Sequence, residues 1–525
     1  MTRSSPWAIR LWALCAGLAA ALAHPPFGVL PGLLGYALLL GLLDTEGERP
    51  WRSAFFRGWL AGLGYFAVSC WWIVEPFMVD AKHQGWMAPI ALPLMAAGFA
   101  LFWGVAGLAY RAIGHRGTAR VFVFAGCLAL IEWVRGHLLT GFPWDLPGET
   151  WRAGSAPSQA ASLVGAYGLT WYTVALAAAP VLLFDKMRRI EKLATAGVIL
   201  GFLGLLYLYG GVRLAHTPAT QPGAPLIRVV QADIDQKEKW RPENLAQVFD
   251  TYVTLTRQKG PERPDIVVWP EGALPAVIDD LLAPDSPFGA RLRDTVEPGQ
   301  TLLMGANHAQ AGPDGQPLYF NSLIAFRREA EGLRVTAVYD KYRLVPFGEF
   351  MPLGKLAGRV GFRSLVHMPD DFTAGPPPQP ITPAGLPALQ PLICYEALFP
   401  GLTRDGARRS GIRAAWILNI SNDAWFGVTS GPLQHLNMAS YRGIEAGLPI
   451  VRATPTGVSA VIDAFGRVQP NARLGLGDLG VIDARLPPAL APTPYARYGD
   501  AFFLLMLVLS GLIALVDRVR RPMVD

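Results

Sequence analysis

The chain has 525 residues, which is too long for one ordinary domain. Its residues are 51% hydrophobic and 16% charged, whereas a soluble globular protein has about 25% charged residues. Part of the chain is therefore expected to lie in lipid. The formal net charge is +6, but the basic residues gather in short loops between apolar runs. That distribution is typical of a membrane protein and argues against a nucleic-acid partner.

Seven apolar runs follow one another in the first 213 residues, and an eighth lies near the C-terminus. A spanning helix needs about 20 apolar residues, so we predict about eight transmembrane helices, of which the first two are short and rich in Gly and Pro. The first run reads as a retained anchor, because the second follows closely. The runs are Trp7–Ala23, Gly28–Leu43, Phe55–Val74, Met87–Tyr110, Val121–Trp133, Ser162–Phe184, Leu193–Val212 and Ala501–Val516.

Lysine and arginine residues are concentrated in every second loop between these runs. The loops after the second, fourth and sixth runs and the C-terminal tail hold most of them. The positive-inside rule then places both termini in the cytoplasm and the long polar segment on the opposite side. We predict three parts: transmembrane helices in residues 1–213, an outer domain in residues 214–497, and the last helix with a cytoplasmic tail in residues 498–525.

The outer segment predicts an α/β domain, because short β-rich runs are separated by stretches that suit helices. Two such helical stretches are Pro242–Gln258 and Leu433–Ala446. The β-rich runs are Ile227–Ile234, Asp265–Trp269, Thr301–Gly305, Ser322–Phe326, Val335–Tyr339, Leu392–Cys394, Ala415–Ile420 and Val458–Asp463.

Three reactive side chains stand at the ends of β-rich runs: Glu271, Lys341 and Cys394. A thiol attacks a carbonyl group as the thiolate and needs a base beside it, a role that Glu271 can take. The tetrahedral oxyanion that follows needs positive charge or N–H donors. The Lys341 ammonium and the backbone N–H of Tyr395 can supply both, and Glu349 can hold Lys341 charged and aimed.

The other cysteines do not compete for this role. Cys15, Cys70 and Cys127 fall inside apolar runs, where Cys usually acts as a small hydrophobe. No CxxC metal pair or disulfide framework is visible. His435 is the most notable histidine of the outer segment, but no Cys-His signature accompanies it, so a Cys-His hydrolase fits less well.

These segments resemble the nitrilase superfamily, and most closely its membrane-bound branch, the apolipoprotein N-acyltransferases. The matching motifs are LVPFGE at Leu344–Glu349, CYE at Cys394–Glu396, SNDAWFG at Ser421–Gly427 and TPYAR at Thr493–Arg497. The arrangement of apolar runs also matches, so the resemblance covers nearly the whole chain. The sequence departs from the family at Pro455, where Asn is common, and at Tyr342, where His is frequent.

The resemblance implies a monomeric enzyme of the bacterial inner membrane with a periplasmic α-β-β-α sandwich as its catalytic domain. The acyl donor would be a membrane phospholipid. The acceptor would be the α-amino group of the diacylglyceryl-cysteine at the N-terminus of an apolipoprotein. The acyl chain would pass through a thioester on Cys394, with Glu271 as base and Lys341 as oxyanion stabiliser. No metal, nucleotide or organic cofactor is expected.

The resemblance also suggests residues around this triad. Glu349, Tyr395 and Glu396 match supporting positions. Trp240 matches a family tryptophan near the substrate entrance. The candidate substrate-binding residues are Trp144, Trp240, Asn321 and Trp425.

Several interpretations stay open at this point. The loop Gly141–Pro147 suits either a floor or entrance for acyl chains or an ordinary interfacial aromatic belt. Glu132 is either functional, since acids inside spans are costly, or paired with Arg135 one turn later. One rival function is a membrane-tethered amidase or nitrilase, which would pass the thioester to water. Another is a transporter or scaffold with an inactive nitrilase-like domain, although few charges lie inside the spans.

Overall fold

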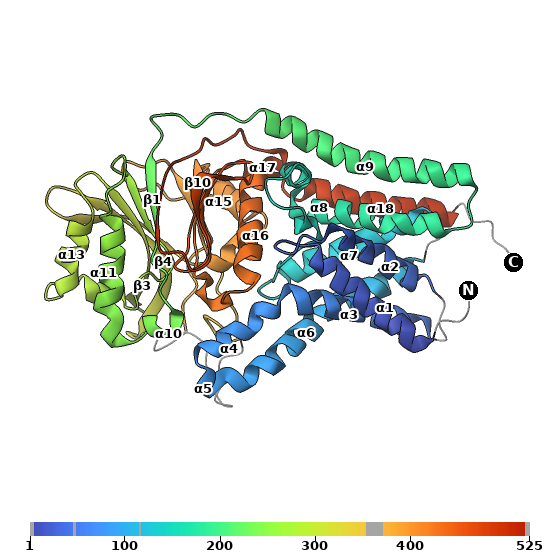
Figure 1. Cartoon of the computed structure of the whole chain (residues 1–525), viewed down its shortest axis with the longest axis horizontal. Coiled ribbons are helices and arrows are strands. Elements are labelled where there is room, and N and C mark those ends of the chain that lie inside the picture. The colour runs from blue at the N-terminus through green and yellow to red at the C-terminus, as the bar shows by residue number, and fades with distance from the viewer. Residues whose placement is uncertain (1–4, 46–48, 115–116, 353–370, 520–525) are drawn as a thin grey trace. The chain divides into compact units, whose positions relative to one another are not determined.

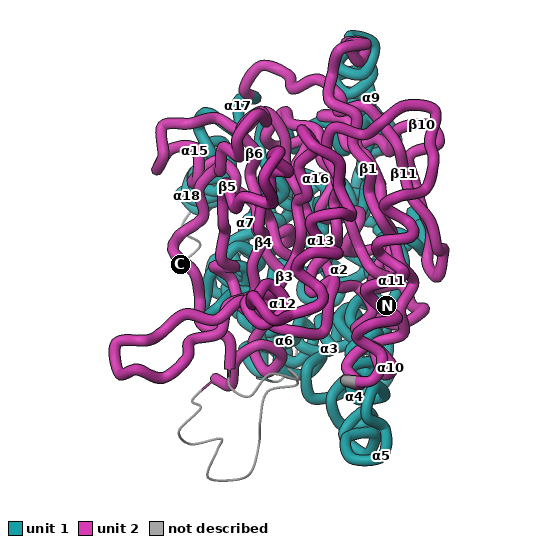
Figure 2. The backbone as a smooth tube through the Cα atoms, turned by 90° about the vertical axis from the view of Figure 1, so that its left-hand side faces the viewer, with its two compact units in different colours: residues 1–217, 493–525 teal, residues 218–492 magenta. Residues whose placement is uncertain are grey.

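The structure is a computed structural model that describes residues 5–45, 49–114, 117–352 and 371–519. The chain divides into two compact units (Figures 1 and 2). Unit 1 comprises residues 1–217 and 493–525, and unit 2 comprises residues 218–492.

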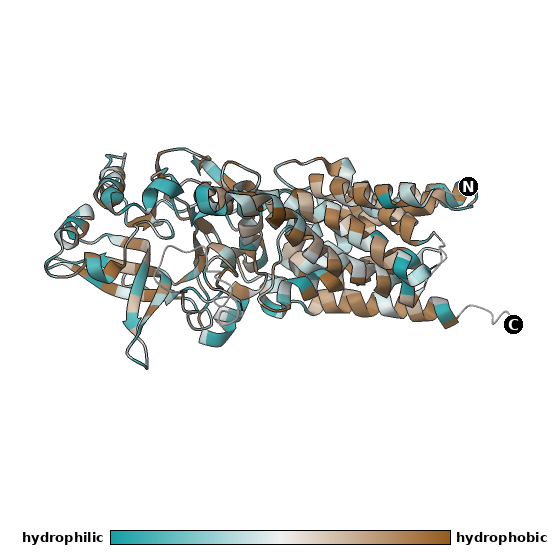
Figure 3. Ribbon diagram, turned by 90° about the horizontal axis from the view of Figure 1, so that it is seen from below, coloured by the Kyte–Doolittle hydropathy of each residue, from teal (hydrophilic) through white to brown (hydrophobic). Residues whose placement is uncertain are grey.

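Unit 1 is helical, and apolar residues dominate its long helices (Figure 3). Most of the expected apolar runs coincide with a helix, although the helices often start or end several residues away from the runs. The helices are α1 (Pro6–Leu22), α2 (Leu34–Leu43), α3 (Pro50–Ser69), α4 (Glu75–Val79), α5 (Ala81–Gln84), α6 (Ala88–Ile113), α7 (Ala119–His137), α8 (Ala161–Ala178), α9 (Arg189–Ala215), α17 (Pro494–Tyr498) and α18 (Ala501–Val519).

The expected number of eight spans is not confirmed. Within the described ranges, three helical stretches are long and apolar enough to cross a membrane, and a fourth counts if α3 and the helix after it, bent by 66°, form one span. The other apolar helices are shorter, and a segment rich in Gly and Pro separates the first two of them. The three stretches are Ala81–Ile113, Pro157–Phe184 and Arg189–Ala215, and the shorter helices are Pro6–Leu22, Leu30–Leu43 and Ala501–Val516.

Helix α7 continues past Glu132, and this acid pairs with Arg135 one turn later. Both side chains are fully buried in unit 1. The indole of Trp103 donates to Glu132 Oε1 at 2.7 Å. Arg135 also donates to the carbonyl oxygens of Phe142 and Trp144. The interpretation of Glu132 as an ion-paired residue is confirmed, and the pair holds the loop that carries Trp144.

Unit 2 contains two mixed β-sheets. The six-stranded sheet has the order β11-β1-β2-β3-β4-β5, and the five-stranded sheet has the order β10-β9-β8-β7-β6. In each sheet three successive strands run parallel, β1-β2-β3 in the first and β6-β7-β8 in the second. The strands are β1 (Leu226–Gln231), β2 (Ile266–Trp269), β3 (Thr301–Ala311), β4 (Pro317–Arg328), β5 (Leu333–Asp340), β6 (Leu389–Ile393), β7 (Trp416–Ile420), β8 (Ile450–Ala453), β9 (Ser459–Ile462), β10 (Val468–Leu474) and β11 (Gly480–Arg485).

The two sheets pack face to face, because alternate residues of their strands form one apolar cluster that includes Val268, Leu323 and Leu418. Helices α11 (Leu245–Thr256) and α13 (Pro287–Thr295) cover the outer face of the six-stranded sheet. Helices α15 (Leu402–Ser410) and α16 (Gly431–Ala446) lie on the outer side of the other sheet (Figure 1). The layers of unit 2 are therefore α-β-β-α, as the family resemblance implies.

Candidate active site

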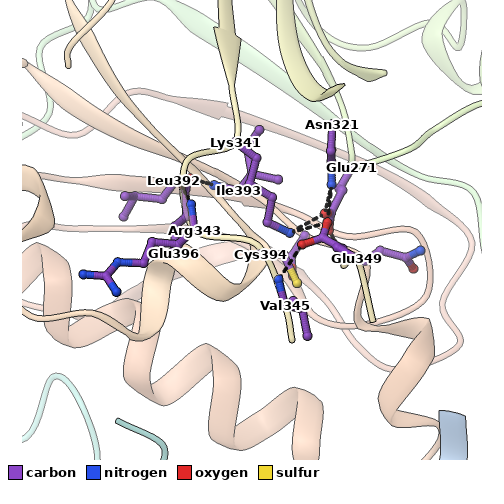
Figure 4. Close-up of polar contacts among 12 residues, drawn as sticks. Glu271, Asn321, Lys341, Arg343, Val345, Glu349, Leu392, Ile393, Cys394 and Glu396 are labelled. Carbon is purple, nitrogen blue, oxygen red and sulfur yellow. Dashed lines mark hydrogen bonds and ion pairs between the residues drawn. The ribbon is translucent and has the colours of Figure 1, made fainter. Parts of the chain in front are cut away.

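The three reactive side chains each follow a strand of unit 2. Glu271 comes two residues after β2, Lys341 comes directly after β5, and Cys394 comes directly after β6. The first two strands belong to the six-stranded sheet and the third belongs to the five-stranded sheet. The structure brings the three residues together where the sheets meet, and Figure 4 shows Cys394 beside the charged groups.

Lys341 is buried, with 1% of its side chain exposed, and it bridges two carboxylates. Its Nζ donates to Glu271 Oε1 at 3.1 Å and to Glu349 Oε1 at 2.9 Å. The amide of Asn321 donates to the same two oxygens at 2.7 and 2.8 Å. Burial lowers the pKa of Lys341, but the charges of Glu271 and then Glu349 outweigh it, so this pKa lies above its usual value. Lys341 is therefore a fixed positive charge.

The remaining carboxylate oxygens accept hydrogen bonds from the backbone. Glu271 Oε2 accepts from the N–H of Asn422 at 2.6 Å, and Glu349 Oε2 accepts from the N–H of Val345 at 2.8 Å. Both acids are buried. Because each oxygen has a donor, both carboxylates are held in one orientation beside the thiol.

Cys394 begins a short 3₁₀ helix, Cys394–Leu398, that follows β6 directly. Its φ of +48° lies in the left-handed region, which costs a non-glycine residue about 1–3 kcal/mol. The expectation that the β-run includes Cys394 is therefore wrong by one residue, because the chain turns there. The turn lifts the side chain off the strand, and Cys394 keeps some solvent exposure.

The thiol of Cys394 is protonated in the resting site. Burial and then the charge of Glu271 raise the pKa of Cys394 to about 12, although the Lys341 ammonium lowers it. A thiolate therefore forms only when a neighbouring base takes the proton, which is the task expected of Glu271.

Glu396 ties the turn of Cys394 to the other sheet. Its Oε2 accepts from the N–H of Ile393 at 2.8 Å. Its Oε1 accepts from the hydroxyl of Tyr339 at 2.8 Å and from the N–H of Tyr342 at 2.9 Å. Burial raises the pKa of Glu396, and these donors counteract that rise. Glu396 acts as a positioning residue, since it joins the segment after β5 to the segment after β6.

Tyr339→Phe is expected to lower the free energy of unfolding of unit 2 by about 1.5–3 kcal/mol, because it removes a donor from a buried carboxylate. Thermal unfolding in detergent measures the change. The matched control is Tyr252→Phe, since Tyr252 is also buried but its hydroxyl has no hydrogen-bond partner among the described residues. The control should be neutral or slightly stabilising. Equal losses in the two variants would contradict a specific contribution from Glu396.

A second buried charge cluster lies against the turn of Cys394, and sequence reasoning missed it as a cluster. Arg452 donates to Asp423 Oδ2 at 2.6 Å, and His435 Nδ1 lies 3.0 Å from Asp423 Oδ1. Burial raises the pKa of Asp423, but Arg452 and then His435 hold it below its usual value. His435 Nε2 lies 3.2 Å from the carbonyl oxygen of Cys394. The histidine therefore contacts the backbone of the Cys394 turn.

Part of this cluster carried a signal in the sequence. Asp423 lies within the SNDAWFG motif and His435 had been singled out, whereas Arg452 sits inside the short buried strand β8 and looked unremarkable.

The candidate substrate-binding residues are placed in different surroundings. Asn321 is buried between the two carboxylates, which is a positioning role. Trp240 and Trp425 are partly exposed in unit 2. Trp144 belongs to the core of unit 1, where its indole donates to the carbonyl of Ser69 at 3.2 Å. Contact of these four residues with substrate stays a prediction. The ring of Tyr395 is buried, and it packs edge-on at 5.1 Å from Phe399.

Two family models match this chain. A model described as the apolipoprotein N-acyltransferase N-terminal domain matches residues 16–179. A model described as carbon-nitrogen hydrolase matches residues 226–495. The second match contains the eleven strands that the structure describes in unit 2, together with Glu271, Lys341 and Cys394.

Curated relatives match almost the full length. The apolipoprotein N-acyltransferase of Caulobacter vibrioides is 53% identical over 98% of this chain and 96% of its own length. That of Bradyrhizobium diazoefficiens is 36% identical over 98% of this chain and 96% of its own length. That of Brucella melitensis biotype 1 is 35% identical over 93% of this chain and 91% of its own length. A crystal structure of an N-terminal amidase aligns with 38% of this chain and 47% of its own at 12% identity, with a TM-score of 0.24.

The residues matched by the two family models agree with the two units and the site described above. The helical unit and the two-sheet unit fall within separate family models, and the candidate nucleophile lies in the second. Relatives from three genera cover more than nine-tenths of the chain at 35–53% identity. The chain therefore belongs to the apolipoprotein N-acyltransferase family.

Proposed function

We propose that this protein transfers an acyl chain from a membrane phospholipid to the α-amino group of the N-terminal diacylglyceryl-cysteine of apolipoproteins. The observation that carries the proposal is the Lys341 ammonium held between Glu271 and Glu349 beside the Cys394 thiol. This arrangement supplies a base, a fixed cation and a nucleophile for acyl transfer. The names of the full-length relatives support an apolipoprotein acceptor and N-acyl transfer, and the phospholipid donor rests on the family resemblance.

In the first half-reaction Glu271 takes the proton from the Cys394 thiol. The thiolate attacks the ester carbonyl of the phospholipid, and the Lys341 ammonium stabilises the oxyanion that develops. The bond between the carbonyl carbon and the glycerol oxygen then breaks. That oxygen receives the proton from Glu271 and departs as the lysophospholipid, which leaves an acyl thioester on Cys394.

In the second half-reaction the amine of the acceptor attacks the thioester carbonyl. Glu271 takes a proton from the amine nitrogen, and the oxyanion again faces Lys341. The carbon–sulfur bond breaks, and Glu271 returns the proton to Cys394. The acyl group passes from an ester to a thioester and then to an amide, which is the most stable of the three. The transfer therefore needs no energy from a nucleotide.

The test is the intact mass of the purified protein after incubation with phospholipid alone. One acyl group should appear on Cys394 and should be released by hydroxylamine, and a diacylglyceryl lipopeptide should then remove it as an N-acyl product. The three cysteines of unit 1 serve as internal controls. Acylation at one of those cysteines, or none at all, would refute the thioester mechanism.

The rival function, a membrane-tethered amidase, shares the same reactive groups. It differs in the acceptor of the thioester, which is water instead of a lipid amine. If the acylated protein releases free fatty acid at the same rate with and without lipopeptide, the amidase is the better description.

We also propose that unit 2 faces the periplasm of a bacterial inner membrane, because the Lys and Arg residues gather in alternate loops of unit 1. A reporter that is active only in the cytoplasm should be silent when fused after Ala215. Activity of that reporter would contradict both the topology and access to exported lipoproteins.

A further inference from the structure

A second buried lysine lies next to the candidate base and has no part in the steps above. Lys239 ends the short helix α10 (Gln236–Lys239) and is 1% exposed. A Cβ placed on Gly272, the residue after Glu271, would lie 3.8 Å from Lys239 Nζ. Within the part of the chain that the structure describes, Nζ has no hydrogen-bond partner, and the Trp240 ring centroid is 5.9 Å away. A buried ammonium is costly unless a partner binds it.

Gln236 provides a second unused donor on the same face of this helix, since it precedes Lys239 by three residues. Its side chain is 5% exposed, and its Oε1 accepts from Asn422 Nδ2 at 3.3 Å. Its Nε2 has no hydrogen-bond partner in the described ranges. The backbone N–H of Asn422 in turn donates to Glu271. Two unused donors, one of them cationic, therefore stand beside the carboxylate base.

The charges of the site indicate what these donors would bind. The two carboxylates of Glu271 and Glu349 face the single ammonium of Lys341, so the net charge of these three side chains is negative and repels an anion. With the ammonium of Lys239 included, the net charge of the four side chains is zero. Burial lowers the pKa of Lys239 to about 8, although Glu271 raises it, so the amine is mostly charged at neutral pH. The protonated acceptor amine would be repelled by Lys239, whereas the phosphodiester of the donor is an anion.

We propose that Lys239 and Gln236 bind the phosphate oxygens of the acyl donor and thereby select a phospholipid over a neutral lipid. This inference rests on the proposed function, because it assigns a binding residue to the donor of that reaction. A compact ammonium with three donors suits a phosphate group. The contribution of Lys239 belongs to the first half-reaction, since the phosphate leaves with the lysophospholipid.

The experiment compares the rates of Cys394 acylation by a phosphatidylglycerol and by a diacylglycerol with the same acyl chains. Both lipids offer the same ester bond and differ in the phosphate. The wild-type protein should react about 10- to 100-fold faster with the phospholipid, which is the usual range for a hydrogen bond to a charged group. Lys239→Met should lose most of this preference. Lys239→Gln, which keeps a donor but no charge, should lose most of it as well.

Controls separate a binding role from a structural one. Lys237→Met changes an exposed lysine of the same helix and should leave the preference as in the wild type. Lys239→Met removes an unpaired buried charge, so its thermal midpoint should not fall. Three results would overturn the inference. In Lys239→Met the acylation rates with the two lipids could fall equally, the preference for phospholipid could be retained, or the transfer from the preformed thioester to the amine could be slower.

Two further outcomes distinguish the sources of phosphate and the underlying function. In one outcome, the wild type shows no phospholipid preference, and inorganic phosphate slows its acylation by diacylglycerol but not that of Lys239→Met. That result would assign the site to free phosphate and overturn the headgroup assignment. A wild-type protein that is acylated by both lipids at equal rates contradicts this inference alone. A wild-type protein that is acylated by neither lipid contradicts the proposed function and this inference with it.

Discussion

Glu271→Gln is expected to slow the acylation of Cys394 by about 10²–10⁴-fold, the usual contribution of a general base. The thiol pKa of about 12 means that almost no thiolate exists without proton transfer. A carboxamide cannot take the proton. In Glu271, one carboxylate oxygen accepts from the Asn422 N–H and the other accepts from Lys341 and Asn321. A glutamine side chain has only one acceptor oxygen, so it cannot accept from both sides.

Single-turnover acylation by phospholipid, followed by intact mass, measures this loss. Glu243→Gln is the matched control, because Glu243 is an exposed acid of the same unit. Its rate should equal that of the wild-type protein. If Glu271→Gln forms the thioester at the normal rate, Glu271 is not the base, and Glu349, which contacts the same ammonium, becomes the next candidate.

Lys341→Met is expected to slow each half-reaction by about 10²–10³-fold, because both pass through an oxyanion and a single donor to it has this value. The substitution also leaves Glu271 and Glu349 as two buried carboxylates without their shared cation. Removing one member of a buried ion pair typically costs about 3–5 kcal/mol. The thermal midpoint should therefore fall together with the rate. Lys341→Arg should rescue poorly, because a planar guanidinium does not replace a compact ammonium.

The double variant Lys341→Met/Glu349→Gln separates the catalytic effect from the effect on stability. It removes one of the two opposing carboxylates, so its thermal midpoint should recover relative to Lys341→Met. Its rate should be little worse than that of Lys341→Met if Glu349 acts only by aiming and charging Lys341. Rate losses that multiply fully would show instead that Glu349 has a separate role.

The strands that carry the site were predictable because each is a short apolar run followed by a polar break. The runs ending at Trp269 and Tyr339 match β2 and β5, and the run Leu392–Cys394 overlaps only the end of β6. Strands β8, β10 and β11 were missed, and the last two are edge strands that contain several polar residues. The number of spans could not be predicted from hydropathy alone, because interrupted apolar runs give short or bent helices.

The residues of the site also divide into those that the sequence predicted and those that it did not. The prediction that Glu271, Lys341 and Cys394 form the site rested on a motif and a strand end at each residue. Arg452 and Lys239 carried no such signal. Arg452 lies in a strand that was not recognised, and Lys239 has Lys237 and Glu238 beside it, a pattern typical of a solvated helix. Only the fold shows that both cations are buried.

The left-handed backbone at Cys394 limits how this enzyme can change during evolution. A β-branched residue is a severe outlier at positive φ, so threonine is excluded as a replacement nucleophile. Serine fits the backbone, but a hydroxyl is a weaker acid than a thiol in the same surroundings, so Glu271 would ionise it less readily. Backbone shape and acidity together favour cysteine at this position, and a β-branched residue could be accepted there only after the turn is rebuilt.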